Sequence, residues 1–318
     1  MVRDSDISIL SDVRSWCASP VICLCGMLAA ACGCVTSAPK EPSVRVMATE
    51  QRDARVVMLE PQTAPDVDSK IVWEWRPSED PGIPAAARSA FDNLDECKSR
   101  DGGRTVLVSA SGGAFAELDA ASRRARAFGV VGGNPHSVER LPDGRYVVAS
   151  SDGNRLTVVD LNGHPLEPDL QKQVRYPLEF AHGVEWDAEG NCLWAIGMKE
   201  IEKLAYDPET MTLKKLAGYR LADVGMSIGH DLVLETASGG KLRFTGHEGV
   251  GTLDPKSGKM ECVEKIQCVK SVSVCGGRVL KTVPKEWWWT DSFEEGGDTY
   301  RISGARFYKA RFLPCRNP

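Results

Sequence analysis

The sequence lacks an excess of positive charge. Its 39 Lys and Arg residues stand against 44 Asp and Glu, which gives a formal net charge of -5. Nucleic-acid surfaces need clustered basic residues, so this balance excludes DNA and RNA as partners. Hydrophobic residues make up 42% of the 318 residues, together with 30 Gly and 18 Pro. This composition is typical of a compact, turn-rich fold with a large core.

The sequence also lacks the common metal-finger and nucleotide-binding motifs. No CxxC pair occurs among the six cysteines beyond residue 34, which argues against a finger-type zinc site: Cys97, Cys192, Cys262, Cys268, Cys275 and Cys315. Disulfides are an option in an oxidising compartment, Cys262 with Cys268 being one candidate, and free buried thiols are the alternative. A Ser-His-Asp order, a nucleophile elbow, a P-loop and a Rossmann fingerprint are all absent.

The apolar stretch near the N-terminus, from Val21 to Ala31, is too short to span a bilayer comfortably, and small residues follow it. The segment "LAAAC" resembles a bacterial lipoprotein signal, in which the cysteine after the small residues receives the lipid. We therefore predict a signal peptide over residues 1–34 with lipidation at Cys32. The alternatives are Cys34 as the acceptor, or cleavage near Ala31 and secretion without lipid.

The next segment, residues 35–54, is rich in Pro, Ser, Thr and charged residues, and predicts a flexible tether. The remaining domain covers residues 55–318. We expect an extracytoplasmic monomer, either secreted or attached by its lipid to the outer or the cytoplasmic membrane.

Four consecutive units of the chain share one layout, in which an ionisable residue opens the unit and an Asp closes it 24 or 25 residues later. The pairs are Asp95 with Asp119, His136 with Asp160, His182 with Asp207, and His230 with Asp254. Short strands such as "RYVVAS" and "RLTVVD" lie between the ends, and turn residues follow each closing Asp. Asp side chains cap such turns.

A unit of about 40 to 50 residues with about four strands is one blade of a β-propeller. Long helical periodicity is absent from residues 100–285, and a further unit starts at Lys270. The N-terminal "RVVMLE" and the C-terminal "FYKARF" have no complete unit of their own, and the two ends of closed propellers commonly share one blade. We predict an all-β, six-bladed propeller closed in this way. Five or seven blades stay open, and a β-sandwich is the alternative that four repeats argue against.

The residues that open the units share one repeat position. The first strand of each blade lines the central channel, so these residues are expected at one mouth of it: Asp95, His136, His182, His230 and Lys270. Burying several ionisable groups together is costly unless they serve each other, water or a ligand. A ligand site is thus predicted, with a water-filled polar plug as the alternative. Glu139 and Glu185 follow a His by three residues and are expected to bond neighbouring blades instead.

Three tryptophans follow the second strand of the Lys270 unit, at positions 287 to 289. Aromatic faces stack on the C–H side of sugars while polar neighbours bond the hydroxyls. We therefore add Trp288, Trp289 and Asp291 to the predicted ligand site. Packing of these tryptophans between blades is the alternative.

Five motifs resemble a family of uncharacterised exported bacterial six-bladed propellers, known only as a domain of unknown function. They are "WEW" at Trp73, "GHDL" at His230, "VKSVS" at Lys270, "WWTD" at Trp288 and "FYKARF" near the C-terminus. The similarity covers residues 55–313 and is more distantly shared with lactonase-like and NHL-type propellers. It implies the fold and export, and it implies no established activity.

Two functions are expected from these residues. The first is binding of a small polar ligand, a carbohydrate above all, at the mouth of the channel. The alternative is a metal-dependent lyase or hydrolase acting on a carbohydrate-type substrate, with His136, His182 and His230 holding Zn²⁺ or Mn²⁺. That alternative requires one nitrogen of each ring to lie about 2.0–2.2 Å from a common point.

Overall fold

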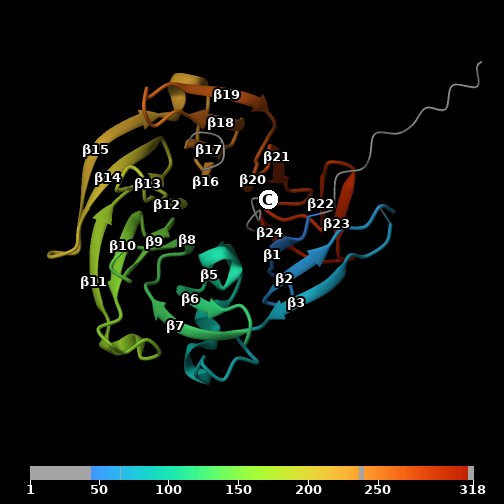
Figure 1. Cartoon of the computed structure of the whole chain (residues 1–318), viewed down its shortest axis with the longest axis horizontal. Coiled ribbons are helices and arrows are strands. Elements are labelled where there is room, and N and C mark those ends of the chain that lie inside the picture. The colour runs from blue at the N-terminus through green and yellow to red at the C-terminus, as the bar shows by residue number, and fades with distance from the viewer. Residues whose placement is uncertain (1–43, 65, 236–239, 314–318) are drawn as a thin grey trace, which may run out of the picture. The chain divides into compact units, whose positions relative to one another are not determined.

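The computed structural model describes residues 44–64, 66–235 and 240–313, which are β-strands joined by turns and short 3-10 helices (Figure 1). The predicted signal peptide and Cys32 lie outside these residues. Within them, no helix has the length and apolar character needed to cross a bilayer. The 3-10 helices are η1 (Ala85–Phe91), η2 (Asp101–Gly103), η3 (Pro168–Leu170) and η4 (Leu221–Val224).

Five four-stranded antiparallel sheets surround a common centre in chain order, as the blades of a β-propeller do (Figure 1). The first is β24 (Phe307–Phe312), β1 (Val46–Glu50), β2 (Arg55–Glu60) and β3 (Lys70–Trp75). The second is β4 (Leu94–Arg100), β5 (Thr105–Ala110), β6 (Ala114–Asp119) and β7 (Arg124–Val130). The third is β8 (Pro135–Arg140), β9 (Tyr146–Ser150), β10 (Arg155–Asp160) and β11 (Lys172–Pro177). The fourth is β12 (Gly183–Asp187), β13 (Cys192–Ile196), β14 (Glu200–Asp207) and β15 (Thr212–Arg220). The fifth is β16 (Asp231–Glu235), β17 (Lys241–Gly246), β18 (Gly249–Leu253) and β19 (Met260–Lys265).

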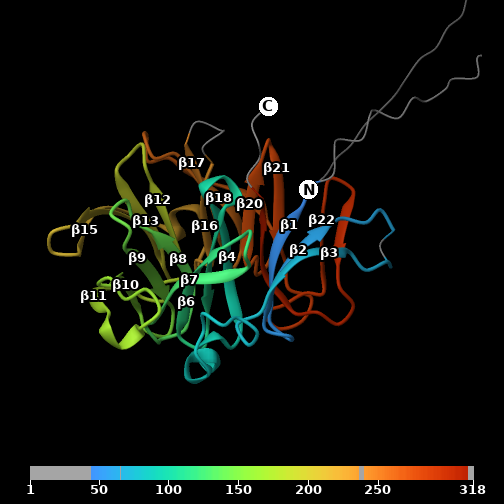
Figure 2. The same cartoon turned by 60° about the horizontal axis from the view of Figure 1, so that its bottom comes forward.

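The count of six complete blades is wrong, because the segment after Lys270 forms two separate hairpins. These are β20 (Ser271–Cys275) with β21 (Arg278–Thr282), and β22 (Ser292–Glu295) with β23 (Asp298–Arg301). The Trp-rich connection between them contains Pro284, which has no N–H to donate to a sheet. Thr299 of β23 instead exchanges backbone hydrogen bonds with Gln62, so β22 and β23 lie beside the first sheet (Figure 2).

The boundary of the tether at residue 54 is also wrong. All five residues of β1 are buried, and β1 pairs with β2 on one side and with β24 on the other. The apolar side chains of Val46, Met47 and Ala48 account for this, because they pack into the cores on the two faces of the sheet. The predicted tether, residues 35–54, is polar on average, and this average conceals the short apolar run that forms β1.

The turns follow the predicted chemistry. Asp160 and Asp254, which close two of the units, accept backbone N–H bonds from the residues that follow, at 2.7 Å from Asn162 and 2.8 Å from Lys256. In the hairpin between β8 and β9, the N–H of Gly144 donates to the carbonyl of Leu141 at 3.0 Å. Gly144 has a φ of 86°, which glycine adopts without strain.

The hydrophobic core lies between neighbouring sheets. Trp75 of the first sheet packs edge-on against Phe91, with ring centroids 5.9 Å apart, and Phe91 contacts Phe128 of the second sheet at 6.2 Å. At the centre, the innermost strands contact one another in the order β24, β4, β8, β12, β16 and β20, and β20 contacts β24. The residues that precede or begin these strands are thereby brought to one place.

The cysteines of the described residues are mostly free thiols: Cys97, Cys192, Cys262 and Cys268. The candidate disulfide between Cys262 and Cys268 is therefore absent. Cys275 is disulfide-bonded.

Candidate functional site

The five residues that open the units line one pocket, with a volume of about 640 Å³. Trp288 and Tyr308 also line it, so six of the eight residues predicted for the ligand site lie together: Asp95, His136, His182, His230, Lys270 and Trp288. Tyr308 was not predicted. It belongs to β24, where it stands one residue before the buried Lys309, as His230 stands before Asp231.

Two β-bulges help to aim these side chains. The pairing of β4 with β5 shifts register between Leu94 and Glu96, and the pairing of β8 with β9 shifts between Pro135 and Ser137. Asp95 and His136 are the extra residues in these bulges. A bulge breaks the strict alternation of a strand, so the bulged residue and the one after it can both face the centre.

The imidazoles form part of a stack of rings along the pocket. His136 and His182 have centroids 4.1 Å apart with 30° between their planes, and Tyr308 stacks on His136 at 5.5 Å. Phe180 contacts His182 at 4.0 Å between centroids, with 38° between their planes. His230 meets His182 edge-on, at 5.3 Å and 71°. The three histidines share one cavity, as equal repeat position predicted.

This arrangement does not fit a metal site made by the three histidines. The ring planes of His136 and His182 are inclined by 30°, and His230 meets His182 edge-on, whereas ligation needs one nitrogen of each ring aimed at one point. Among the residues that the structure describes, no group of three or more His, Cys, Asp or Glu side chains converges in a way that could hold a metal ion. The geometry therefore does not support the predicted Zn²⁺ or Mn²⁺ site at His136, His182 and His230. Equal repeat position brings the three residues together, but it does not specify how their side chains are oriented.

The environment keeps two of the imidazoles neutral. Burial, followed by the neighbouring rings of His136 and His230, holds the pKa of His182 well below its usual value. Nδ1 of His182 lies 3.1 Å from the carbonyl oxygen of Phe180 and must donate to it, which leaves Nε2 as an acceptor. Burial and then the charge of Lys270 likewise hold the pKa of His230 well below its usual value.

His230 and Lys270 form a close pair. Nζ of Lys270 lies 3.2 Å from Nε2 of His230, and a neutral imidazole nitrogen can accept a hydrogen bond from it. Nδ1 of His230 is buried without a hydrogen-bond partner in the described part of the chain. Nδ1 of His136 is in the same position, because it lies 3.3 Å from Oδ2 of Asp95 without the alignment of a hydrogen bond.

A chain of hydrogen bonds links three further residues that line the pocket: Trp288, Gln51 and Asp95. Nε1 of Trp288 donates to Oε1 of Gln51 at 3.0 Å, and Nε2 of Gln51 donates to Oδ1 of Asp95 at 3.0 Å. Oδ2 of Asp95 accepts a further bond from Ser111 at 2.6 Å. This chain fixes the carboxylate and the indole relative to each other. Gln51 was missed because it follows β1, in the segment assigned to the tether.

Asn134 and Asp152 complete the polar lining. Nδ2 of Asn134 donates to Oδ2 of Asp152 at 3.1 Å, and Oδ1 of Asn134 is buried without a partner among the described residues. Three residues that line the pocket, His136, His230 and Asn134, thus carry a buried polar atom without a partner in the described part of the chain.

Two predicted residues lie elsewhere. Trp289 does not line the pocket and stacks under the guanidinium of Arg306, 5.1 Å from its ring centroid. Asp291 accepts a bond from Nζ of Lys285 at 2.9 Å. Trp287 is 85% exposed and meets Trp288 edge-on at 6.4 Å. Of the three tryptophans, Trp288 alone lines the pocket, because consecutive residues in a turn point in different directions.

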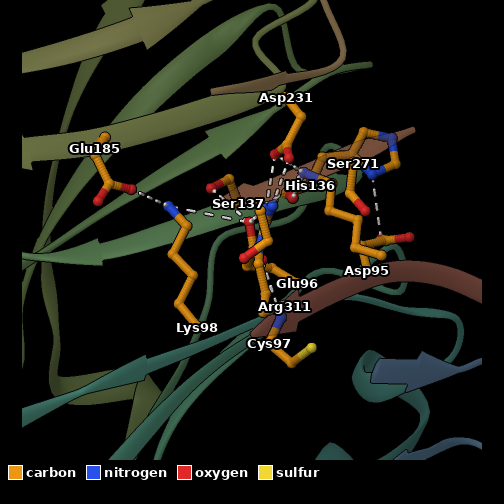
Figure 3. A network of polar contacts seen from close by, with 12 residues as sticks. Asp95, Glu96, Cys97, Lys98, His136, Ser137, Glu185, Asp231, Ser271 and Arg311 are labelled. Carbon is orange, nitrogen blue, oxygen red and sulfur yellow. Dashed lines mark hydrogen bonds and ion pairs between the residues drawn. The ribbon is translucent and has the colours of Figure 1, made fainter. Parts of the chain in front are cut away.

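A second polar layer, which was not predicted, lies beside the pocket on the same strands (Figure 3). Glu96, Asp231 and Lys309 each follow a pocket residue directly, and Arg311 stands three residues after Tyr308. Arg311 donates from Nε and Nη2 to both oxygens of Glu96, at 2.9 and 2.8 Å, and from Nη2 to Oδ1 of Asp231 at 2.7 Å. Lys309 is fully buried and donates to Oδ1 of Asp231 at 3.0 Å. Burial opposes ionisation of Glu96, but Arg311 and Lys309 outweigh it and bring the pKa of Glu96 well below its usual value.

Glu139 and Glu185 bond neighbouring blades, as predicted. Arg100 of β4 donates to Glu139 of β8 at 3.0 Å and to Glu185 of β12 at 3.0 Å. Nζ of Lys98 lies 3.2 Å from the second oxygen of Glu185. These pairs join three successive inner strands.

Comparison with known proteins places the chain in a family and a fold. A family model described as "Family of unknown function (DUF6528)" matches residues 37–316. No curated protein matches the chain. One similar solved structure is a chain of the nidogen/laminin complex, with a TM-score of 0.59 and 13% identity, covering 86% of this chain and 100% of that one. Another is the β-propeller domain of Myceliophteria thermophila Cps50 (Swd1), with a TM-score of 0.52 and 13% identity, covering 86% and 91%. At these identities the similarity shows the propeller fold alone.

Proposed function

The chain belongs to the Family of unknown function (DUF6528), and we propose that it binds a small polar ligand, most suitably a carbohydrate, in the pocket at the mouth of its channel. The family description names no activity, so the proposal is argued from the pocket. The observation that supports this is the pocket's combination of a ring stack with buried polar atoms that have no partner in the described protein. Unpartnered buried polar atoms are costly, and a ligand that bonds them recovers this cost.

The lining favours a neutral, hydroxyl-rich ligand. Asp95 and Asp152 can accept hydrogen bonds, Lys270 can donate, and neutral imidazoles can do either. A sugar hydroxyl both donates and accepts, so it can bond the donors and the acceptors of this lining. The indole of Trp288 supplies an apolar face at the side of the pocket, which suits the C–H face of a pyranose.

The enzymatic alternative, a metal-dependent lyase or hydrolase acting on a carbohydrate-type substrate, loses the three-histidine metal site on which it was based. One observation still favours chemistry at this place, which is the contact between Lys270 and His230.

We further propose that the protein acts outside the cytoplasm as a monomer, held at the outer or cytoplasmic membrane by a lipid on Cys32 or secreted. The apolar leader before Cys32 and the disulfide at Cys275 support export, because disulfides persist in oxidising compartments. We also propose that the hairpins β20–β21 and β22–β23 together occupy a sixth blade position. The contacts of β20 with β16 and β24 support this.

The binding proposal is tested by titration calorimetry of the purified protein against a panel of neutral mono- and oligosaccharides. Trp288→Ala is expected to weaken a saccharide that binds by at least about tenfold, which corresponds to about 1.4 kcal/mol. Trp289→Ala is the matched control, since this indole packs on Arg306 outside the pocket, and affinity should be unchanged. Equal losses in both variants, or no binding of any saccharide to the parent, would refute the proposal.

A further inference from the structure

Lys270 differs from the other lysines at the centre of the molecule. Lys98 has Glu185 at 3.2 Å and Lys309 has Asp231 at 3.0 Å, so each of those ammonium groups faces a carboxylate. Lys270 forms no ion pair with any carboxylate of the described residues, and its hydrogen-bond partner is the imidazole of His230. It also lines the pocket, where a ligand can reach it.

These surroundings favour the free amine over the ammonium ion. A half-buried ammonium without a carboxylate is poorly stabilised, and the buried charge of Lys309 repels it. Burial lowers the pKa of Lys270; the thiol of Cys268 opposes this and Lys309 adds to it. A free amine is a nucleophile toward carbonyl carbon, and lysines in such settings form imines.

We propose that Lys270 captures the carbonyl group of a polyhydroxylated aldehyde or ketone, such as the open form of a reducing sugar, as an imine, with His230 transferring the protons. The inference rests on the pocket being a ligand site, as proposed above, and adds a covalent step to it.

The step balances without any oxidant or reductant. The lone pair of Nζ attacks the carbonyl carbon, forming the C–N bond as the C=O π bond opens, and Nε2 of His230 takes a proton from the nitrogen. His230 returns that proton to the alkoxide oxygen, which gives the neutral carbinolamine. The nitrogen then forms the C=N bond as the C–O bond breaks, and His230 carries the second nitrogen proton to the departing hydroxyl, which leaves as water. Hydrolysis reverses both stages and releases the carbonyl compound.

The position of His230 suits this exchange. Its Nε2 stands 3.2 Å from Nζ, within direct proton-transfer distance. Its pKa, lowered by burial, keeps the ring neutral and able to accept the proton at neutral pH. His230 is in this respect a catalytic residue, and the hydroxyls of the ligand would bond the acidic wall at Asp95 and Asp152.

The test is reductive trapping. The protein is incubated at neutral pH with glyceraldehyde and cyanoborohydride, which reduces an imine to a stable secondary amine, and the modified lysines are identified by peptide mass spectrometry. The exposed Lys199 and Lys256 are internal references in the same molecule. Lys270 is expected to be modified at least about twofold faster than either, because a lowered pKa raises the fraction of free amine at neutral pH. A ratio below about twofold overturns the inference.

Two variants sharpen the result. Lys270→Arg keeps a long basic side chain at this position and removes the nucleophile, so trapping there must vanish. His230→Gln is expected to slow the modification of Lys270 while Lys199 reacts at its former rate; an unchanged rate overturns the role given to His230. A parent protein that binds saccharides in calorimetry but shows no preferred trapping at Lys270 would sink this inference and leave the binding proposal standing. A parent protein that binds no saccharide in calorimetry would refute both the binding proposal and this inference.

Discussion

Two polar layers lie at the centre of the propeller, on the same inner strands. The upper layer consists of the residues that open the units and line the pocket, and the lower layer is the ion network of Glu96, Asp231, Lys309 and Arg311. The two layers differ in how completely their buried polar atoms are paired. In the lower layer, Arg311 bonds both Glu96 and Asp231, so each buried charge there has its counter-charge. In the upper layer, Nδ1 of His230 and Nδ1 of His136 have no partner among the described residues. Proteins satisfy buried polar groups where structure alone is concerned. The difference supports a structural role for the lower layer and agrees with the ligand binding that we propose for the upper one.

Removing the strand that serves both layers should have the largest effect. Deletion of residues 304–318 takes away β24, and with it Tyr308, Lys309 and Arg311. It also leaves β1 with an open edge. We expect loss of cooperative unfolding, measured by circular dichroism on heating. A truncated protein with the parent's melting temperature would show that β24 is dispensable, and the division between layers would lose its basis.

Breaking the lower layer alone comes next. Arg311→Met leaves Glu96 and Asp231 buried with only lysines to compensate them, and should lower the free energy of unfolding by about 3–5 kcal/mol. The matched control is Arg45→Met, because Arg45 pairs with Glu60 at the surface with 54% of its side chain exposed. That change should cost less than about 1 kcal/mol. Urea unfolding of the two variants compares them directly, and equal costs would contradict a structural role for the lower layer.

The same layer predicts a pH dependence of stability. Burial raises the pKa of Glu96 and Asp231, but the buried cations outweigh it, so both values in the folded protein lie below their usual ones. Groups with a depressed folded pKa contribute stability above their unfolded pKa and lose it as the pH falls. The urea midpoint should therefore drop below about pH 5. In Arg311→Met the drop should be smaller, and parallel pH profiles of parent and variant would contradict the assignment.

Changing the upper layer should affect stability least. His182→Phe exchanges a buried neutral ring for one of similar size between Phe180 and His136, and loses one hydrogen bond to the Phe180 carbonyl. The unfolding free energy should stay within about 1 kcal/mol of the parent value, while saccharide affinity falls by about tenfold or more. A variant as unstable as Arg311→Met would place His182 among the structural residues.

Sequence reasoning found the mouth of the channel because repeat position carries spatial information. Five residues that open the units, spread from Asp95 to Lys270, do line one pocket. The same alignment contained the lower layer: Glu96, Asp231 and Lys309 each stand one residue after a mouth residue. The sequence analysis did not predict them, because their residue types differ from blade to blade. Their constant place directly after a pocket residue is nevertheless a signal that could have identified them.

The rest depended on geometry that no spacing encodes. The stacking of His136 on His182, which removes the metal site, is set by side-chain rotation within the pocket. The splitting of the last blade depends on Thr299 pairing with Gln62, a contact between segments far apart in the chain. The strand β1 was lost because a five-residue apolar run was averaged with its polar surroundings.

The place of β24 in the chain has a consequence for biosynthesis. Thr49 accepts and donates hydrogen bonds with Lys309, 260 residues away. Contacts of such long separation make folding slow, because the chain between them must be ordered first. A nascent chain that does not yet reach Arg311 lacks Tyr308 of the ring stack and the cations Lys309 and Arg311 of the ion network. The complete pocket therefore requires that β24 has been synthesised, so a ligand that stabilises it cannot act on shorter nascent chains.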